Sequence, residues 1–352
     1  MKIVSAQPVS NARSLPDAAL LDRMRDLGAR YPDARLRPVT LVRAAELDER
    51  ADRSGLTRVW LALECLQITG SFKARGALAA LGALREKSSG PLHVVAASAG
   101  NHGAGVAYAA RVLGVSATVV VPKSAPRAKR DRIAACGAEV RLAASVHYDD
   151  AEAEALALAA REGAPFVSAY DDLDVLAGNG ASLGFEITRA LGRVPDAVVV
   201  PFGGGGLASG MACALATEEG KEPGSAAMAR RVWGVQSDAC PAMAQSLERG
   251  AAIEKMGAEE TLADGLEGGI SARAFARAAS VVAGVGVVTE ISIRDALAFA
   301  ARELGLVLEG SAACGLAPAL LGLPPQVGGG DVVCVLTGRN VDRSVLDKAL
   351  DA

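Results

Sequence analysis

Aromatic residues are scarce in this sequence: Phe, Trp and Tyr make up 3% of its 352 residues. A hydrophobic core must therefore come mainly from Ala, Val and Leu. Paired cysteines are lacking too, because the six cysteines are scattered, with no CxxC pair and no metal-ligand spacing. We therefore expect no metal site and interpret the cysteines as buried thiols in a reducing compartment. They are Cys65, Cys136, Cys213, Cys240, Cys314 and Cys334.

An excess of charge of one sign is also absent. The chain has 37 Lys and Arg against 40 Asp and Glu, a net charge of −3, with both signs mixed along its length. Without a basic stripe we expect no nucleic-acid partner. No run approaches the roughly 20 apolar residues that span a bilayer, and the N-terminus lacks the apolar segment of a signal peptide. These absences predict a cytoplasmic enzyme or binding protein with no membrane partner.

Short apolar runs alternate with helix-like segments from about residue 91 onward. Runs such as LHVVAAS, SATVVVP, DAVVVPF and DVVCVLTG are typical of parallel strands covered on both faces. The sequence therefore predicts an α/β fold with largely parallel sheets, and its length suggests about two domains. Ligands of such sheets bind at the carboxyl ends of strands, so the turns that follow strands are the candidate sites.

Four consecutive glycines, Gly203 to Gly206, stand between an apolar strand and a helix. Backbone N–H groups at such a junction, with the dipole of the following helix, form a phosphate site. A dinucleotide loop is an alternative, because Gly203, Gly205 and Ala208 satisfy a loose GxGxxG/A pattern, but Gln236 stands where an acidic ribose ligand is expected. A Walker A loop is excluded, since no Lys-Ser or Lys-Thr pair follows. We favour a single phosphate over these nucleotides and over a flexible loop.

The segment ITGSFKARGA places a lysine where a helix disfavours one. Gly70 and Ser71 predict a turn and an N-cap, and residues 72–84 predict a helix with Lys73 in its first turn. The helix dipole disfavours a cation there, and Arg75 adds a second positive charge. We expect both to lower the pKa of Lys73, which suits an amine that must attack as a neutral nucleophile.

Two further turns follow predicted strands. In AASAGNHG, the hydroxyl of Ser98, the amide of Asn101 and the neighbouring N–H groups could hold an anion. His102, considered alone, is better interpreted as a surface residue of the first helical turn. In VCVLTGRN, Thr337 offers a hydroxyl at the end of the last strand. That stretch alone would indicate only a turn before the final helix.

Four motifs, taken in their order along the chain, resemble those of the fold type II pyridoxal-phosphate enzymes. The resemblance is to the branch of threonine/serine dehydratases and serine racemases. GSFKARGA is similar to the family's SFKxRGA, and SAGNHGAGVA to its S-[AS]-GNH turn. GGGGL is similar to its phosphate loop and LTGRN to its SGGN. The resemblance covers about residues 56–345. It implies two open, mostly parallel twisted sheets flanked by helices, of the tryptophan synthase β-like type, with pyridoxal 5'-phosphate as cofactor.

The resemblance implies a role for each matching residue. Lys73 would form a Schiff base with the cofactor, and Phe72 would lie against it. Asn101 would bond the ring hydroxyl, Thr337 would face the pyridine nitrogen, and Glu309 would lie near the ring. The phosphate would be held by Gly203, Gly204, Gly205, Gly206 and Leu207, and the substrate carboxylate by the turn of Ser98, Ala99, Gly100, Asn101 and His102.

Departures from the family pattern narrow the range of reactions to be expected. Ala99 has no proton to give, whereas serine racemases carry serine there, so elimination is favoured over racemisation. Gln236 replaces an acidic residue with which some relatives hold a divalent cation, although Asp238 could still contribute. Arg339 replaces the second glycine of SGGN, where a bulky cation could reshape the pocket or meet an acid of a substrate or partner.

The resemblance implies β-elimination from a small β-hydroxy-α-amino acid such as threonine or serine, giving a 2-oxo acid and ammonia. It also implies a homodimer, with residues 1–85 plus 168–352 as a large cofactor domain and 86–167 as a small mobile domain. The alternatives left open are β-replacement, threonine synthesis or racemisation on the same cofactor, a nucleotide-binding oxidoreductase, and a non-catalytic sensor.

Overall fold

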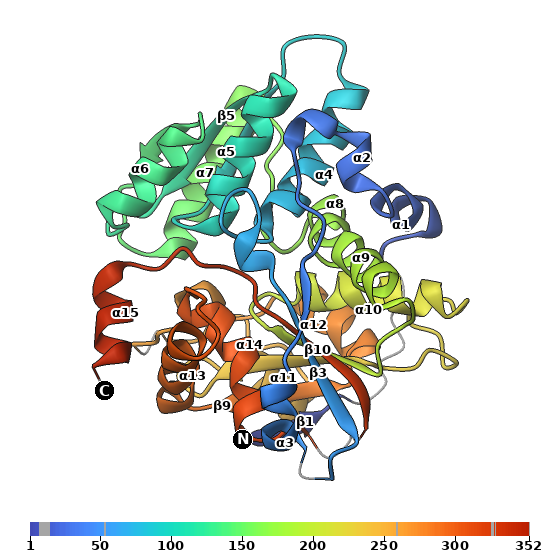
Figure 1. Ribbon diagram of the computed structural model, residues 1–352. Coiled ribbons are helices and arrows are strands. Elements are labelled where there is room, and N and C mark those ends of the chain that lie inside the picture. Colours follow the sequence, from blue (N-terminus) through green and yellow to red (C-terminus); the bar gives the residue numbers. More distant parts are fainter. Residues whose placement is uncertain (7–14, 53, 258–259, 325–326, 328, 352) are drawn as a thin grey trace.

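The computed structural model describes most of the chain, and its elements form two separate sheets (Figure 1). One sheet has seven strands and lies in the lower part of the view, and the other has three and lies at the upper left. The α/β fold predicted from the sequence is confirmed. The described residues are 1–6, 15–52, 54–257, 260–324, 327 and 329–351.

The seven-stranded sheet is parallel in its centre and antiparallel at both edges. Its inner strands are apolar and buried along almost their whole length, as parallel strands with both faces covered must be. The strands lie in the order β1 (Lys2–Ser5), β9 (Gly284–Val288), β8 (Val232–Ser237), β7 (Ala197–Pro201), β10 (Gly330–Val335), β3 (Thr57–Ala62) and β2 (Leu41–Arg43).

The three-stranded sheet is fully parallel, in the order β4 (His93–Ala97), β5 (Ser116–Val121) and β6 (Glu139–Leu142). It carries α5 (Asn101–Leu113), α6 (Arg127–Ala135) and α7 (Tyr148–Glu162). Beside β4, Phe166 forms only an isolated bridge with Val95. These elements all fall within residues 86–167; the division of the chain into two domains stays a prediction.

The other helices cover the seven-stranded sheet or join the two sheets. In the described part of the chain, none is long and apolar enough to cross a membrane. They are α1 (Ala18–Met24), α2 (Leu27–Arg30), α3 (Asp48–Ala51), α4 (Lys73–Lys87), α8 (Leu173–Leu176), α9 (Ser182–Leu191), α10 (Gly206–Glu218), α11 (Ala242–Arg249), α12 (Ala272–Val281), α13 (Glu290–Arg302), α14 (Gly310–Leu321) and α15 (Arg343–Leu350). Short helical turns are η2 (Pro32–Ala34), η3 (Ala45–Leu47), η4 (Glu64–Leu66), η6 (Asp264–Leu266) and the π-helical η5 (Ala177–Ala181).

Small residues let η5 pack between two helices that carry sequence motifs. A Cβ on Gly178 would lie 2.6 Å from the Cβ of Ala79 on α4. A Cβ on Gly180 would lie 2.4 Å from the carbonyl oxygen of Leu207 on α10. Because interiors pack without slack, these contacts fix the start of α4 relative to the start of α10.

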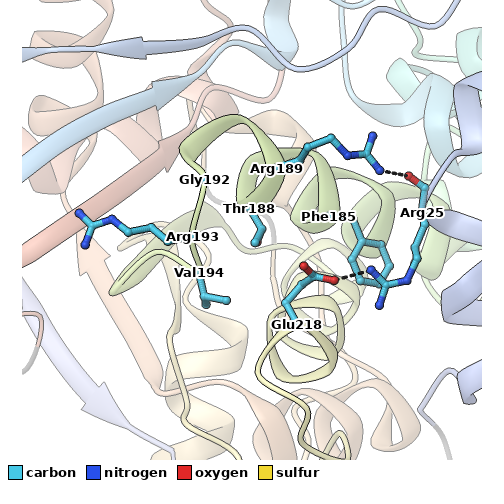
Figure 2. Close-up of a pocket in the computed structure, with 8 residues that line it drawn as sticks. All are labelled: Arg25, Phe185, Thr188, Arg189, Gly192, Arg193, Val194 and Glu218. Atoms are coloured by element: carbon cyan, nitrogen blue, oxygen red, sulfur yellow. Dashed lines mark hydrogen bonds and ion pairs between the residues drawn. The ribbon is translucent and has the colours of Figure 1, made fainter.

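A pocket of about 470 Å³ lies between α9, α10 and the end of α1 (Figure 2). The guanidinium of Arg25 stacks over the ring of Phe185 at 4.4 Å and pairs with Glu218. The other two arginines of the pocket also have carboxylate partners, Asp26 and Asp331. No residue of the four motifs lines this pocket, so the candidate site lies elsewhere. The lining residues are Arg25, Phe185, Thr188, Arg189, Gly192, Arg193, Val194 and Glu218.

Candidate active site

The four sequence motifs meet at the carboxyl ends of their strands. The backbone N–H of Phe72 donates to the carbonyl oxygen of Thr337 at 3.0 Å, which joins the start of α4 to the end of β10. The amide of Asn101 at the start of α5 donates to both carboxylate oxygens of Glu309 at 2.8 and 3.0 Å. Tyr170 packs beside Gly204 and so places the glycine loop next to these segments. Segments far apart in the sequence therefore form one cluster.

Lys73 begins α4 and is partly buried. Its Nζ donates to the carbonyl oxygen of Ala169 at 3.4 Å and lies 5.2 Å from the centre of the Phe72 ring. Burial lowers its pKa from 10.5 to about 8, because the ammonium loses its hydration, while Glu309 opposes the shift. The expected N-cap is wrong: Phe72 occupies that position, and the buried hydroxyl of Ser71 has no partner among the described residues.

Capture of pyridoxal phosphate by the apoprotein is expected to accelerate as the pH rises through about 8. The pKa of Lys73 is about 8, so the neutral amine that can attack an aldehyde predominates only above that value. Stopped-flow absorbance after mixing apoprotein with the cofactor gives the rate at each pH. A rate that increases only above pH 10, as for a lysine in water, would contradict the buried environment.

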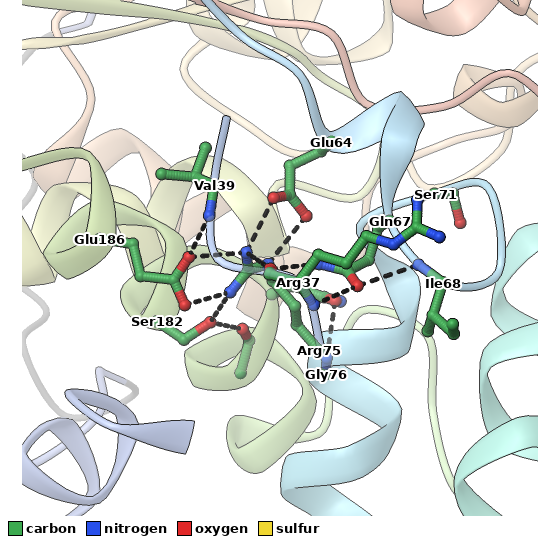
Figure 3. A network of polar contacts seen from close by, with 12 residues as sticks. Arg37, Val39, Glu64, Gln67, Ile68, Ser71, Arg75, Gly76, Ser182 and Glu186 are labelled. Carbon is green, nitrogen blue, oxygen red and sulfur yellow. Dashed lines mark hydrogen bonds and ion pairs between the residues drawn. The ribbon is translucent and has the colours of Figure 1, made fainter. Parts of the chain in front are cut away.

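Arg75 does not lower the pKa of Lys73, and that prediction is wrong. The Arg75 side chain is fully buried and donates four hydrogen bonds of 2.8 Å, two to Glu64 and two to Glu186 (Figure 3). The two negative charges of Glu64 and Glu186 outweigh the single positive charge of Arg75. Arg75 therefore adds no net positive charge that could lower the pKa of Lys73. Glu186 also accepts the N–H of Val39 at 2.7 Å. The network thus ties the chain before β2 and helix α9 to the helix that carries Lys73.

Replacing Arg75 with methionine is expected to destabilise the protein by about 3–5 kcal/mol, because it leaves two carboxylates unpaired at a buried position. The free energy of unfolding in urea measures the change. Arg85→Met, on the same helix, is the matched control. Arg85 is only partly buried and bonds two loop carbonyls, so its loss should change stability by less than about 1 kcal/mol. Equal losses in both variants would refute the network's role.

Glu309, Asn101 and Asn340 form a closed ring of hydrogen bonds. The N–H of Asn340 donates to Glu309 at 3.1 Å, and its side-chain amide donates to Asn101 at 2.6 Å and to the carbonyl of Thr69 at 3.0 Å. Burial raises the pKa of Glu309 to about 7, although the Asn101 bond acts in the opposite direction. The sequence did not identify Asn340 as a site residue; its position at the end of LTGRN was the one available signal.

His102 is buried, so its interpretation as a surface residue is wrong. Its Nε2 lies 3.0 Å from the carbonyl oxygen of Val167, and burial lowers its pKa to about 3, which keeps the ring neutral. A neutral ring that donates from Nε2 has only a lone pair at Nδ1, and this atom is buried without a partner among the residues described. In the same turn Ser98 accepts the N–H of Gly100 at 3.1 Å. His102 can therefore help to bind a carboxylate only through its backbone N–H.

The glycine loop leads directly into α10. Gly205 is the N-cap with a φ of +80°, a conformation that glycine adopts without strain, and none of the described side chains caps the helix. A Cβ on Gly204 would lie 2.7 Å from the Cβ of Tyr170. A Cβ on Gly206 would meet no heavy atom within 4 Å. The uncapped N–H groups and the helix dipole therefore make an anion site whose approach stays open because the loop lacks side chains.

The departures from the family pattern lie around this cluster. Gln236 is buried and fully engaged: its Nε2 donates to the carbonyl of Phe202 at 3.1 Å and its Oε1 accepts the N–H of Ala244 at 3.0 Å. No group of three or more His, Cys, Asp or Glu that could hold a metal occurs among the described residues, Asp238 included. The side chain of Arg339 is exposed, which gives no support to the expectation that it reshapes the pocket.

A family model described as "Pyridoxal-phosphate dependent enzyme" matches residues 35–338. The chain belongs to this family. The resemblance found in its motifs is thereby confirmed, as is the cofactor. A nucleotide-binding oxidoreductase is no longer required to explain the glycine loop, since the family's own cofactor carries a phosphate.

Relatives within the family include ammonia-lyases. The chain is 38% identical over 297 residues to the L-threonine ammonia-lyase of Thermotoga maritima, covering 83% of this chain and 70% of the relative. It is 36% identical over 293 residues to the Escherichia coli L-threonine dehydratase catabolic TdcB, covering 81% and 84%. Its structure is similar to threonine deaminase isoform 2 from Solanum lycopersicum, with a TM-score of 0.82 and 27% identity over 99% of this chain and 91% of that one. Maize serine racemase matches with a TM-score of 0.80 and 25% identity, covering 94% and 96%.

The residues of the cluster fit pyridoxal phosphate. A lysine whose pKa is lowered to about 8 can react with an aldehyde near neutral pH. The uncapped start of α10 suits a phosphate, and a Cβ at Gly206 would meet no heavy atom within 4 Å. The buried Thr337 adds a neutral hydroxyl at the end of β10. The donor set therefore matches an aldehyde, a phosphate and a pyridine ring within one site.

Proposed function

We propose that this protein is a pyridoxal-phosphate dependent ammonia-lyase that converts threonine or serine into a 2-oxo acid and ammonia. The observation that carries this proposal is the partly buried amine of Lys73, whose pKa is about 8, in one cluster with Asn101, Glu309 and the uncapped glycine loop. Relatives named threonine ammonia-lyase and threonine dehydratase support the same reaction.

The cofactor would be held by residues from five segments of the chain. We assign covalent attachment to Lys73, the contact with the ring to Phe72, and hydrogen bonds at the ring to Asn101 and Thr337, with Glu309 alongside. We assign the phosphate to the N–H groups of Gly203, Gly204, Gly205, Gly206 and Leu207, and the substrate carboxylate to the turn of Ser98, Ala99, Gly100, Asn101 and His102.

Bound pyridoxal phosphate supplies an electron sink for the α-carbon of the amino acid. Lys73 then accepts the α-proton at Nζ, which a neutral amine with a pKa of about 8 can do near neutral pH. Thr337 would offer the pyridine nitrogen a neutral hydroxyl and no carboxylate, which suits a reaction in which the β-hydroxyl leaves rapidly, departing with one proton as water. The released aminoacrylate hydrolyses in water to the 2-oxo acid and ammonia.

Elimination is favoured over racemisation by Ala99. Racemisation needs a proton donor on the face opposite Lys73, and a methyl group cannot supply one. L-threonine, L-serine and L-threo-3-phenylserine should be incubated with the holoenzyme and assayed for 2-oxo acid, ammonia and D-amino acid. Formation of 2-oxo acid with equal ammonia supports the proposal. D-serine without 2-oxo acid would establish a racemase, and no product from any of the three would refute the assigned reaction.

We also propose a cytoplasmic homodimer with a large domain of residues 1–85 plus 168–352 and a small domain of residues 86–167. The separate three-stranded sheet within the second segment supports this division. Light scattering coupled to size-exclusion chromatography measures the oligomeric state, and a monomer at micromolar concentration would refute the dimer.

A further inference from the structure

Tyr170 lies between the amine of Lys73 and the glycine loop. It directly follows Ala169, whose carbonyl oxygen accepts the hydrogen bond from Lys73 Nζ at 3.4 Å. A Cβ on Gly204 would lie 2.7 Å from the Cβ of Tyr170 and 3.1 Å from its Cγ. Tyr170 is therefore bonded to the residue that accepts the Lys73 hydrogen bond, and its Cβ and Cγ lie against Gly204 of the proposed phosphate site.

The hydroxyl of Tyr170 is hydrogen-bonded to a carboxylate on α7, one of the helices that the three-stranded sheet carries. It donates to Glu152 at 2.7 and 2.6 Å. One helical turn earlier, the hydroxyl of Tyr148 donates to the carbonyl of Ala97 at 3.3 Å, and Ala97 directly precedes the turn that begins at Ser98. Tyr148 and Glu152 are four residues apart and therefore share one face of α7. This face lies beside the Ser98 turn at Tyr148, and at Glu152 it contacts Tyr170, which lies beside the glycine loop.

The surroundings of Glu152 are rich in carboxylates. Burial raises its pKa, and so do the neighbouring Asp149 and Asp171, while the Tyr170 hydrogen bond opposes the shift. Arg277 lies 3.7 Å from Asp171 and donates to the Tyr170 carbonyl at 3.2 Å. Three carboxylates, those of Glu152, Asp149 and Asp171, therefore lie close together on this side of the site, with Arg277 beside Asp171.

We propose that Glu152, held in place by Tyr170, is a specificity-determining residue that excludes amino acids with a second carboxylate and admits those with an uncharged hydroxylated side chain. The inference rests on the proposed function, since it takes the space between the Ser98 turn, which would hold the substrate carboxylate, and the glycine loop, which would hold the cofactor phosphate, as the place of the substrate side chain. A substrate carboxylate near Glu152 would meet a like charge in a partly desolvated place, where repulsion is stronger than in water.

The test compares L-serine with L-threo-3-hydroxyaspartate, which share the leaving hydroxyl and differ by a carboxylate. The holoenzyme is expected to prefer serine in kcat/KM by about 100-fold, the size of a like-charge effect of this kind. Glu152→Gln keeps an acceptor for the Tyr170 hydroxyl but removes the charge. It should raise kcat/KM for hydroxyaspartate about 10-fold or more and change that for serine less than about 3-fold. Glu162→Gln, at the exposed end of α7, is the matched control and should change neither value.

Two outcomes would overturn the inference: equal kcat/KM for both substrates in the wild type, or unchanged discrimination in Glu152→Gln. Binding separates this failure from failure of the proposed reaction. The dissociation constants of L-serine and L-aspartate, measured from the visible absorbance of the holoenzyme, require no turnover. If neither hydroxyamino acid is dehydrated but Glu152→Gln still improves aspartate binding selectively, the reaction is wrong and the specificity role stands. Thermal melting of each holoenzyme verifies that the variants are folded.

Discussion

Lys73→Ala is expected to lower 2-oxo acid formation from threonine or serine by at least about 1000-fold. General base catalysis by a positioned group contributes about 100- to 10,000-fold, and this variant also loses covalent attachment of the cofactor. Lys73 is the one lysine in the first turn of α4, and Lys129, which lies close enough to act on the pKa of Glu309, is paired with Asp264. The variant should still fold, since the Nζ makes a single long hydrogen bond of 3.4 Å to a backbone carbonyl.

Chemical labelling checks attachment independently of turnover. Borohydride reduction of the wild-type holoenzyme should fix the cofactor on the peptide that contains Lys73, as detected by mass spectrometry. The Lys73→Ala variant should yield no modified peptide and should lose the visible absorbance of the bound cofactor. Lys87→Ala, at the exposed end of the same helix, is the control and should behave like the wild type. Labelling at another lysine would overturn the assignment.

Gly206→Val is expected to weaken pyridoxal phosphate binding by about 10- to 100-fold, the range that follows from losing one hydrogen bond to a charged group. Because Cβ atoms of a helix tilt towards its N-terminus, a side chain at the first residue of α10 is expected to project towards the uncapped N–H groups, and a Cβ there meets no protein atom within 4 Å. The same open space means that the fold should tolerate the substitution. The variant therefore tests the phosphate site without the steric conflict that Gly204→Val would create at Tyr170.

Equilibrium dialysis of apoprotein with the cofactor measures the affinity, and thermal melting of the apoprotein measures stability. Gly90→Val serves as the control, because a Cβ at Gly90 is also free of contacts but lies in the loop before β4, outside all four motifs. Unchanged affinity in Gly206→Val would show that the phosphate binds elsewhere. A fall in affinity accompanied by an equal fall in the control would indicate a general effect on folding.

Those parts of the candidate site that depend on local backbone chemistry could be predicted from the sequence, although their roles stay a proposal. A lysine at the start of a helix and a glycine run after a strand are visible as patterns because neighbours along the chain create them. The α/β fold was predictable for the same reason, since each strand reveals its burial by its own apolar run. Gly205, with its φ of +80°, is such a locally determined position.

Predictions failed where a distant segment decides the environment of a residue. Arg75 was expected to act on Lys73, but Glu186, 111 positions along the chain, and Glu64 take its charge. His102 was expected at the surface, but Val167 and the core around it bury the ring. Asn340 was not recognised, because its partners Asn101 and Thr69 are brought to it only by folding.

By itself the sequence determined the family and its cofactor, and it showed the order of the segments that we propose to bind it, since the lysine at a helix start, the glycine loop and the Asn-bearing turn are each encoded within a few adjacent residues. Only the tertiary structure decided the electrostatics of the site. Burial, and not a neighbouring arginine, lowers the pKa of Lys73 to about 8, and burial raises that of Glu309 to about 7. The physical reason is that desolvation and charge pairing depend on distance in space, which a linear sequence does not specify until the chain has folded.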